Sequence, residues 1–256
     1  MKIEIKEAGK TYIENGQEFT ALKDVNLDIE EGEFICLLGP SGCGKSTLLN
    51  AIAGFAPVNH GSIKIDGKEV EKPSEKNVTI FQNYGLLPWR NVSKNVELGL
   101  ESKKISKEER KKIANRYIEL VGLKDYKKSY PRQLSGGMQQ RVAIARALAV
   151  NPDILFMDEP FAALDAITRM KLQDDILDIC KKEKKTIIFV THDIEEAVYL
   201  ADRIVVMTPN PGKVKSIVKV PIKHFRERTG DDFLMVRDKI FELFNLKTDN
   251  YIEYNI

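Results

Sequence analysis

Residues 39–46 read GPSGCGKS, and residues 134–140 read LSGGMQQ. The first stretch fits the pattern G-x-x-x-x-G-K-[ST], whose glycines allow a tight turn with backbone N–H groups that converge on phosphate oxygens. It follows a continuous apolar run over residues 34–38 and precedes a helical pattern that begins at Lys45. A phosphate-binding turn between a buried strand and a helix N-terminus predicts a nucleoside triphosphate site.

The segments on both sides of this turn have strand and helix patterns. Apolar and charged residues alternate over residues 3–5 and 27–29, which predicts short strands before the phosphate loop. Later, the apolar runs 154–157 and 186–190 are each followed by a helical pattern. Such alternation predicts a largely parallel α/β sheet with ligand-binding loops at the carboxyl ends of its strands.

Between residues 92 and 150 the pattern becomes helical, and we expect a helical subdomain inserted into the core. Ser106 with Glu109 is placed as a capping box, and Asp193 with Glu196 is placed as a cap and box partner for a later helix. The predicted domains are 1–91 (an N-terminal β subdomain and the first part of the nucleotide-binding core), 92–150 (helical), 151–210 (the second part of the core) and 211–256 (a C-terminal tail).

Composition narrows the class of protein. The chain has 256 residues, 43% of them hydrophobic and 30% charged, as is usual for a globular protein. Its 40 basic and 38 acidic residues give a net charge of +2, so charge provides no overall attraction to nucleic acid or anionic lipid. No apolar run approaches the roughly 18 to 20 residues of a membrane-spanning helix, so any membrane passage must belong to another polypeptide. The three cysteines lack metal-ligand spacing, and the start MKIEIKEAGK lacks the apolar region of a secretory signal.

Acidic and imidazole side chains follow two of the predicted strands. Asp158 ends the run 154–157 and Glu159 comes next, while His192 follows the run 186–190. A carboxylate at the tip of a buried strand is placed to hold the Mg²⁺ of a bound nucleotide. The alternative is that Asp158 and Glu159 form an ordinary exposed acidic pair.

The stretch LSGGMQQ matches the signature of the ATP-binding cassette family, and with the phosphate loop it makes the chain similar to the ATPase subunit of an ABC transporter. The likeness covers residues 3 to about 210. It implies an α/β P-loop NTPase core with an N-terminal antiparallel β subdomain and an inserted α-helical subdomain. It also implies ATP and Mg²⁺ as cofactors.

The resemblance also implies roles for single residues. Glu159 resembles the family's general base, His192 the switch histidine that bonds the γ-phosphate, and Gln82 the glutamine that touches Mg²⁺ and the attacking water. Tyr12 resembles the aromatic residue that stacks on adenine, with Phe19 as an alternative. The implied nucleotide-binding residues are Tyr12, Gly39, Pro40, Ser41, Gly42, Cys43, Gly44, Lys45, Ser46, Thr47, Gln82, Ser135, Gly136, Gly137 and His192. The implied metal ligands are Ser46, Gln82 and Asp158.

The signature turn is a second anion site, because Ser135, Gly136 and Gly137 stand at a helix start. If the signature turn bound the ATP of its own chain, it would repeat the role of the phosphate loop. In the family it closes on the γ-phosphate held by a second copy, so that two chains enclose two ATP molecules head to tail. Residues 163–165 resemble the D-loop that crosses this interface.

The apolar run 86–89, which ends at Trp89, follows Gln82 and would suit a groove that receives a short helix of a membrane permease. The alternative is that Trp89 packs inside the helical subdomain. This run, Phe161 and residues 209–212 resemble the nitrate, sulfonate and taurine import branch. That branch implies a bacterial importer subunit at the cytoplasmic face of the membrane, with transmembrane permease subunits and, indirectly, a periplasmic or lipid-anchored solute-binding protein.

Two other function classes compete with the transporter. A soluble ABC ATPase that acts on DNA or ribosomes usually carries a long coiled coil or a tandem cassette, and neither fits between the two glycine turns. A kinase that uses the phosphate loop alone leaves LSGGMQQ and His192 unexplained. An exporter cassette is usually fused to a membrane domain. We therefore expect an importer ATPase without a nucleic acid partner.

Overall fold

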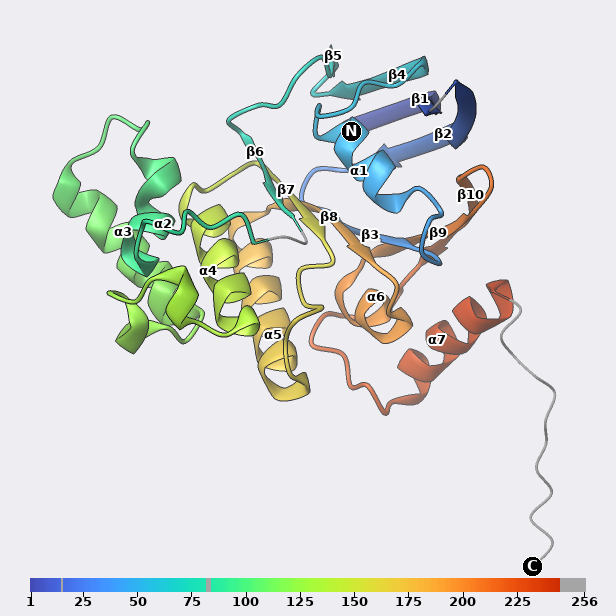
Figure 1. Cartoon of the computed structure of the whole chain (residues 1–256). Coiled ribbons are helices and arrows are strands. Elements are labelled where there is room, and N and C mark those ends of the chain that lie inside the picture. Colours follow the sequence, from blue (N-terminus) through green and yellow to red (C-terminus); the bar gives the residue numbers. More distant parts are fainter. Residues whose placement is uncertain (15, 82–83, 245–256) are drawn as a thin grey trace, which may run out of the picture.

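Two β-sheets with helices packed around them form the chain in a computed structural model that describes residues 1–14, 16–81 and 84–244 (Figure 1). The smaller sheet has the strand order β2-β1-β4-β5, and every pairing in it is antiparallel. Its strands are β1 (Ile3–Glu14), β2 (Gln17–Ile29), β4 (His60–Ile65) and β5 (Lys68–Glu69). The predicted antiparallel β subdomain is therefore confirmed.

The first two strands are longer than the alternation of residues predicts. β1 has 12 residues and β2 has 13, because the two pair as one antiparallel hairpin from Ile3 opposite Ile29 to Glu14 opposite Gln17. Three register shifts interrupt this ladder, and each breaks the period of two that the sequence pattern relies on. The prediction of short strands was wrong for this reason.

The larger sheet has the strand order β10-β9-β3-β8-β7-β6. All its pairings are parallel except that of β9 with the edge strand β10, which confirms the predicted largely parallel sheet. Its strands are β3 (Phe34–Leu38), β6 (Asn77–Ile80), β7 (Ile154–Asp158), β8 (Thr186–Thr191), β9 (Arg203–Thr208) and β10 (Lys213–Lys219).

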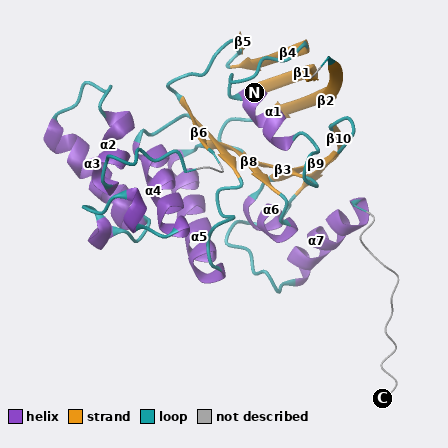
Figure 2. Ribbon diagram, in the orientation of Figure 1, coloured by secondary structure: helices purple, strands orange, loops and turns teal. Residues whose placement is uncertain are grey.

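Helices surround this sheet (Figure 2). They are α1 (Lys45–Ile52), α2 (Val92–Glu97), α3 (Lys107–Leu120), α4 (Gly136–Ala149), α5 (Ala166–Glu183), α6 (Ile194–Leu200) and α7 (Asp231–Leu243). Short 3-10 turns cover Leu98–Leu100, Lys124–Tyr126 and Pro131–Gln133. The helices α2, α3 and α4 pack against one another between β6 and β7 in the chain, as the inserted helical subdomain of the fold requires. In the described part of the chain, no helix is long and apolar enough to cross a membrane.

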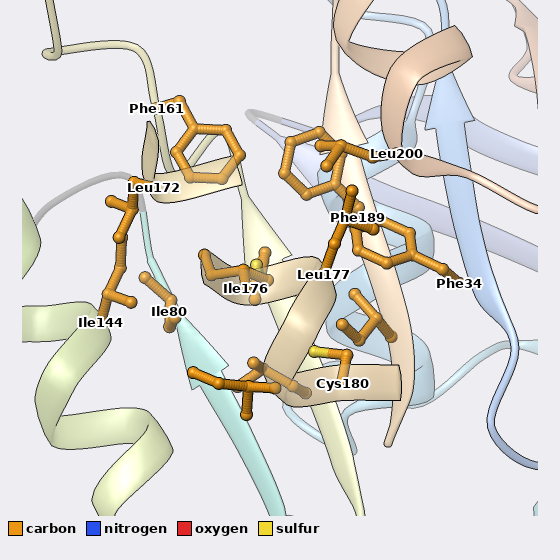
Figure 3. Close-up of a cluster of buried hydrophobic side chains, with 14 of the residues drawn as sticks. Phe34, Ile80, Ile144, Phe161, Leu172, Ile176, Leu177, Cys180, Phe189 and Leu200 are labelled. Atoms are coloured by element: carbon orange, nitrogen blue, oxygen red, sulfur yellow. The ribbon is translucent and has the colours of Figure 1, made fainter. Parts of the chain in front are cut away.

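Both faces of the larger sheet are buried, as is usual for a parallel sheet. Side chains alternate along β3, so Phe34 belongs to one hydrophobic cluster while Ile35 and Leu37 belong to the other. On the first face, the ring of Phe189 lies 5.5 Å from that of Phe161 and 5.9 Å from that of Phe34 (Figure 3). Residues of α4, α5 and α6 cover this face, and residues of α1 and the smaller sheet cover the other.

The helix caps agree with the sequence only in part. Ser106 Oγ accepts the N–H of Glu109 at 3.1 Å, and Asp193 Oδ1 accepts the N–H of Glu196 at 3.1 Å. Glu196 was predicted to return a bond to the Asp193 N–H, and that was wrong. Thr191 Oγ1 takes this N–H at 3.0 Å, and the buried Glu196 carboxylate accepts from Thr191 Oγ1 instead. The Thr191 hydroxyl therefore takes both of the bonds that the capping-box pattern assigns to a direct contact between Glu196 and Asp193.

Asp202 ties the C-terminal segment to the central strand. Its Oδ2 accepts the N–H of Phe34 at 2.8 Å, and its Oδ1 lies 2.9 Å from Nε2 of His224. Burial raises the pKa of Asp202, but the hydrogen bonds from His224 and Phe34 outweigh it, so the pKa is lower than usual. A carboxyl with a lowered pKa stabilises the fold above its unfolded pKa of about 3.9, and this contribution is lost as pH falls through the lower folded value.

We therefore expect Asp202→Ala to lower the free energy of unfolding by about 1 kcal/mol at pH 7, a modest value because the side chain is partly exposed. The difference from the wild type should shrink as pH falls below about 4. Urea unfolding at both pH values measures it. Asp178→Ala, which removes an exposed pair with Lys182, is the control and should have almost no effect. An Asp202→Ala midpoint equal to that of the wild type would contradict the role of Asp202.

Candidate active site

The phosphate loop joins the end of β3 to the start of α1. Gly44 caps α1 with φ of 89°, and an added Cβ would lie 2.8 Å from the carbonyl oxygen of Ala21, so only glycine fits. The Lys45 side chain is buried, and its Nζ donates to the carbonyl oxygens of Gly39 at 2.8 Å and Pro40 at 3.0 Å. The ammonium is thus held inside the loop, beside the N–H groups of the helix start, and the two together favour an anion.

The other loop residues take different positions around this centre. Ser41 and Gly42 are exposed, Thr47 is half-buried in the first turn of α1, and Ser46 is exposed beside it. The Cys43 side chain is fully buried in the core, and burial raises the pKa of its thiol. Cys43 therefore offers a phosphate its backbone rather than its sulfur.

Ser46 and Asp158 meet where β7 ends beside α1. Ser46 Oγ donates to Asp158 Oδ1 at 3.0 Å. Burial raises the pKa of Asp158, the bond from Ser46 lowers it, and the neighbouring Glu159 carboxylate raises it further. Burial and the Glu159 charge disfavour the ionised form of Asp158, and a cation beside Asp158 would stabilise it. A hydroxyl with a carboxylate is a ligand set that suits Mg²⁺ shared with nucleotide phosphates. The third predicted ligand, Gln82, lies outside the described residues.

Glu159 and His192 form a second pair at the same ends of the strands. His192 Nδ1 lies 3.1 Å from Glu159 Oε1, with the imidazole 61% exposed and the carboxylate 21% exposed. Glu159 has φ of 47°, an uncommon conformation for glutamate, and its N–H donates to the carbonyl oxygen of Val190. A cavity of about 120 Å³ adjoins the pair and is lined by Glu159, Ala162, Arg169, Thr191, His192, Asp193 and Glu196. The carboxylate is therefore both oriented and open to a small molecule such as water.

Gln140 links the signature helix to this pair, a contact that the sequence analysis does not predict. The side chain is 2% exposed. Its Nε2 lies 3.4 Å from the carbonyl oxygen of Glu159, and its Oε1 accepts the N–H of Ala163 at 3.3 Å. The only sequence signal for this bridge is that Gln140 ends LSGGMQQ.

The signature turn is exposed at the start of α4. Ser135 Oγ accepts the N–H of Met138 at 3.3 Å, and Ser135 and Gly136 are open to solvent. An added Cβ on Gly136 would lie 2.9 Å from the hydroxyl of Tyr84, and one on Gly137 would lie 3.1 Å from the carbonyl oxygen of Ala163. The buried residues of α4 and α1 belong to clusters on opposite faces of the larger sheet. The phosphate loop and the signature turn therefore precede helices that lie on opposite faces of the larger sheet.

Tyr12 and Phe19 stand directly opposite each other on β1 and β2. Their side chains are 41% and 52% exposed, and Lys10 Nζ lies 5.2 Å from the centre of the Tyr12 ring. The β2 strand also contacts α1, which follows the phosphate loop. Stacking of either ring on adenine stays a prediction.

A groove of about 730 Å³ lies on the helical side of the molecule. Residues of β6 and α4 line it, with Phe81, Tyr84 and residues between Leu98 and Lys104. Arg146 donates to the carbonyl oxygens of Tyr84 at 2.9 Å and Gly85 at 2.7 Å, and burial lowers the pKa of its guanidinium. Trp89 is 71% exposed, so the alternative in which it packs inside the helical subdomain is wrong.

Known proteins resemble the chain along most of its length. A family model described as ABC transporter matches residues 22–162. An aliphatic sulfonates import ATP-binding protein of Bacillus subtilis is 45% identical over 98% of this chain and 96% of its own. A nitrate import ATP-binding protein of Synechococcus elongatus is 44% identical over 86% of this chain and 81% of its own. A solved dimeric ATP-binding cassette, bound to ADP and Pi after hydrolysis, has a TM-score of 0.80 and 37% identity over 86% of this chain and 100% of its own.

Proposed function

This chain belongs to the ABC transporter family, as an ATP-binding and ATP-hydrolysing subunit, and on that premise we propose that it powers import of a small anion through a separate permease. The observation that carries the hydrolytic part is the Glu159–His192 pair beside the Ser46–Asp158 pair. Import, with a sulfonate, taurine or nitrate as solute, is supported by the sulfonate and nitrate import relatives.

In the proposed reaction, Lys45 and the N–H groups of the phosphate loop hold the β- and γ-phosphates. Ser46 and Asp158 would hold Mg²⁺, whose chemistry there is to supply positive charge beside the phosphate oxygens. Glu159 accepts the proton of the attacking water, and His192 keeps its carboxylate in line through the 3.1 Å contact. Gln82, predicted to sense the γ-phosphate, has no described position, so we assign it no contact.

Two copies are proposed to complete each site. The phosphate loop already has its charged partners in Lys45, Asp158, Glu159 and His192, whereas the exposed Ser135 and Gly136 have no phosphate loop on their own face of the sheet. A head-to-tail pair would place the signature turn of each copy on the ATP of the other. The dimeric solved cassette supports this arrangement.

The 730 Å³ groove and Trp89 are proposed to receive the permease. Asn95 is fully buried and fixes the loop that carries Trp89: its Nδ2 donates to the carbonyl oxygens of Leu87 and Arg90, and its Oδ1 accepts the N–H of Leu87. A large apolar ring on a loop held this firmly suits a docking contact. Residues 92–150 would then move as a unit when ATP closes the dimer.

We expect Trp89→Ala to weaken permease binding about 10-fold, because exposed tryptophans are frequent anchors of interfaces. ATP hydrolysis by the isolated chain should stay within about 2-fold of the wild type, because Trp89 is exposed and, within the described residues, has no hydrogen bond or ring contact with Glu159 or His192. Titration of the chain into the permease in detergent measures binding, and Tyr126→Ala, which removes another exposed ring, is the control. Unchanged binding by Trp89→Ala would remove this ring from the docking surface.

The proposal places the chain at the cytoplasmic face of the membrane, with a solute-binding protein engaged only through the permease. Purification of the tagged chain from membranes should recover permease subunits, and reconstitution in liposomes should show which small anions stimulate ATP hydrolysis. Recovery of ribosomes or DNA without a membrane protein would favour the soluble ABC ATPase instead.

A further inference from the structure

Polar contacts run from the C-terminal segment to the turn that carries His192. Arg228 Nη2 donates to Gln173 Oε1 at 2.6 Å. Gln173 is fully buried on α5, and its Nε2 donates to Glu196 Oε1 at 3.3 Å. The other oxygen of Glu196 accepts from Thr191 Oγ1 at 2.9 Å. Three bonds thus connect Arg228 to the last residue of β8.

The Thr191 hydroxyl fixes the backbone on both sides of His192. It donates its single hydrogen to Glu196, which leaves its lone pairs free for the N–H of Asp193 at 3.0 Å. These bonds hold Thr191 and Asp193 in place on the two sides of His192. The imidazole between them is thereby kept 3.1 Å from the Glu159 carboxylate.

Arg228 and Glu196 together fix the orientation of the Gln173 amide. Guanidinium groups only donate, so the amide must turn its oxygen to Arg228 and its nitrogen to Glu196. Without Arg228 the amide oxygen loses its donor, and the buried Gln173 side chain is held only by its bond to Glu196. The guanidinium is itself held 3.9 Å from the centre of the Tyr199 ring, whose hydroxyl donates to Asp174.

We infer that Arg228 is a positioning residue for ATP hydrolysis, acting through Gln173 and Glu196 on the Thr191–Asp193 turn and so on His192. This inference rests on the proposed roles of His192 and Glu159. It gives the C-terminal segment a function in the reaction without any contact with nucleotide.

The test compares steady-state ATP hydrolysis by full-length variants. Arg228→Ala should lower kcat about 5-fold and leave KM for ATP within about 2-fold, since residues that act through a network change coupling modestly and the phosphate loop is untouched. Arg237→Ala, on the same C-terminal segment but paired with its neighbour Asp238, is the matched control and should keep the wild-type kcat. Melting temperatures identify any variant that fails to fold.

A double variant tests the route. If Arg228 acts through Gln173, the pair Arg228→Ala with Gln173→Ala should lose no more kcat than Gln173→Ala alone. If the double variant loses kcat by the product of the two single losses, the inference is overturned. A folded Arg228→Ala protein with the wild-type kcat would also overturn it. Should Arg228→Ala not fold, Arg228→Met replaces it, because methionine keeps much of the side-chain length but has no donor for Gln173: about a 5-fold lower kcat supports the inference, and a wild-type kcat overturns it.

Glu159→Gln in the same assay separates this inference from the proposed function. If Glu159→Gln hydrolyses ATP at the wild-type rate, the proposed function has failed. If Glu159→Gln is inactive while Arg228→Ala is folded and fully active, only the role of Arg228 has failed.

Discussion

Glu159→Gln is expected to lower the rate of ATP hydrolysis on the order of 100-fold to 10,000-fold while ATP binding persists, because loss of a general base removes proton transfer alone. The carboxylate is 3.1 Å from His192 and open to the cavity of about 120 Å³, whereas the phosphate loop does not use it. Phosphate release measures the rate, and nucleotide titration measures the affinity. ATP that binds without being hydrolysed should also hold two copies together, which light scattering detects.

The matched control is Glu108→Gln, which changes an exposed glutamate in the first turn of α3 and should hydrolyse ATP like the wild type. A Glu159→Gln protein that stays monomeric and fully active would remove Glu159 from the reaction.

Lys45→Ala is expected to weaken ATP binding by at least about 100-fold. The ammonium supplies charge-assisted hydrogen bonds to phosphate, each worth roughly 1.5 to 3 kcal/mol. It also contacts the carbonyl oxygens of Gly39 and Pro40, so its loss removes the group that gathers the loop. Nucleotide titration measures the effect, with Lys68→Ala in the exposed strand β5 as the control. Equal ATP affinity in Lys45→Ala and the wild type would place nucleotide binding elsewhere.

Short-range signals predicted the parts of the fold that carry the site. The apolar runs that form β3, β7 and β8 are buried on both faces, so they read as continuous strands, and the residue after each run falls at the same edge of the sheet. The caps at Ser106 and Asp193 were also predictable, because each involves an N–H within three residues. The run RIVVMT of β9 is a similar buried apolar signal, whereas KVKSIVK of β10 alternates lysines with apolar residues along the exposed edge of the sheet.

Contacts between distant segments decided what the sequence did not predict. Glu196 bonds to Gln173 because α5 packs beside it, and no local pattern contains that neighbour. Gln140 reaches the Glu159 carbonyl from another layer of the fold. The exposure of Trp89 depends on how Asn95 shapes its loop, which composition alone cannot indicate.

Complementation between two defective variants tests most directly whether each site is shared by two copies. Lys45→Ala lacks a working phosphate loop, and Ser135→Arg fills the exposed signature turn, so each alone should be inactive. In a mixture, the phosphate loop of the second variant and the signature turn of the first form one intact site. We predict that the mixture hydrolyses ATP although neither variant does so alone. A mixture as inactive as its components, or a fully active Ser135→Arg protein, would contradict the shared site.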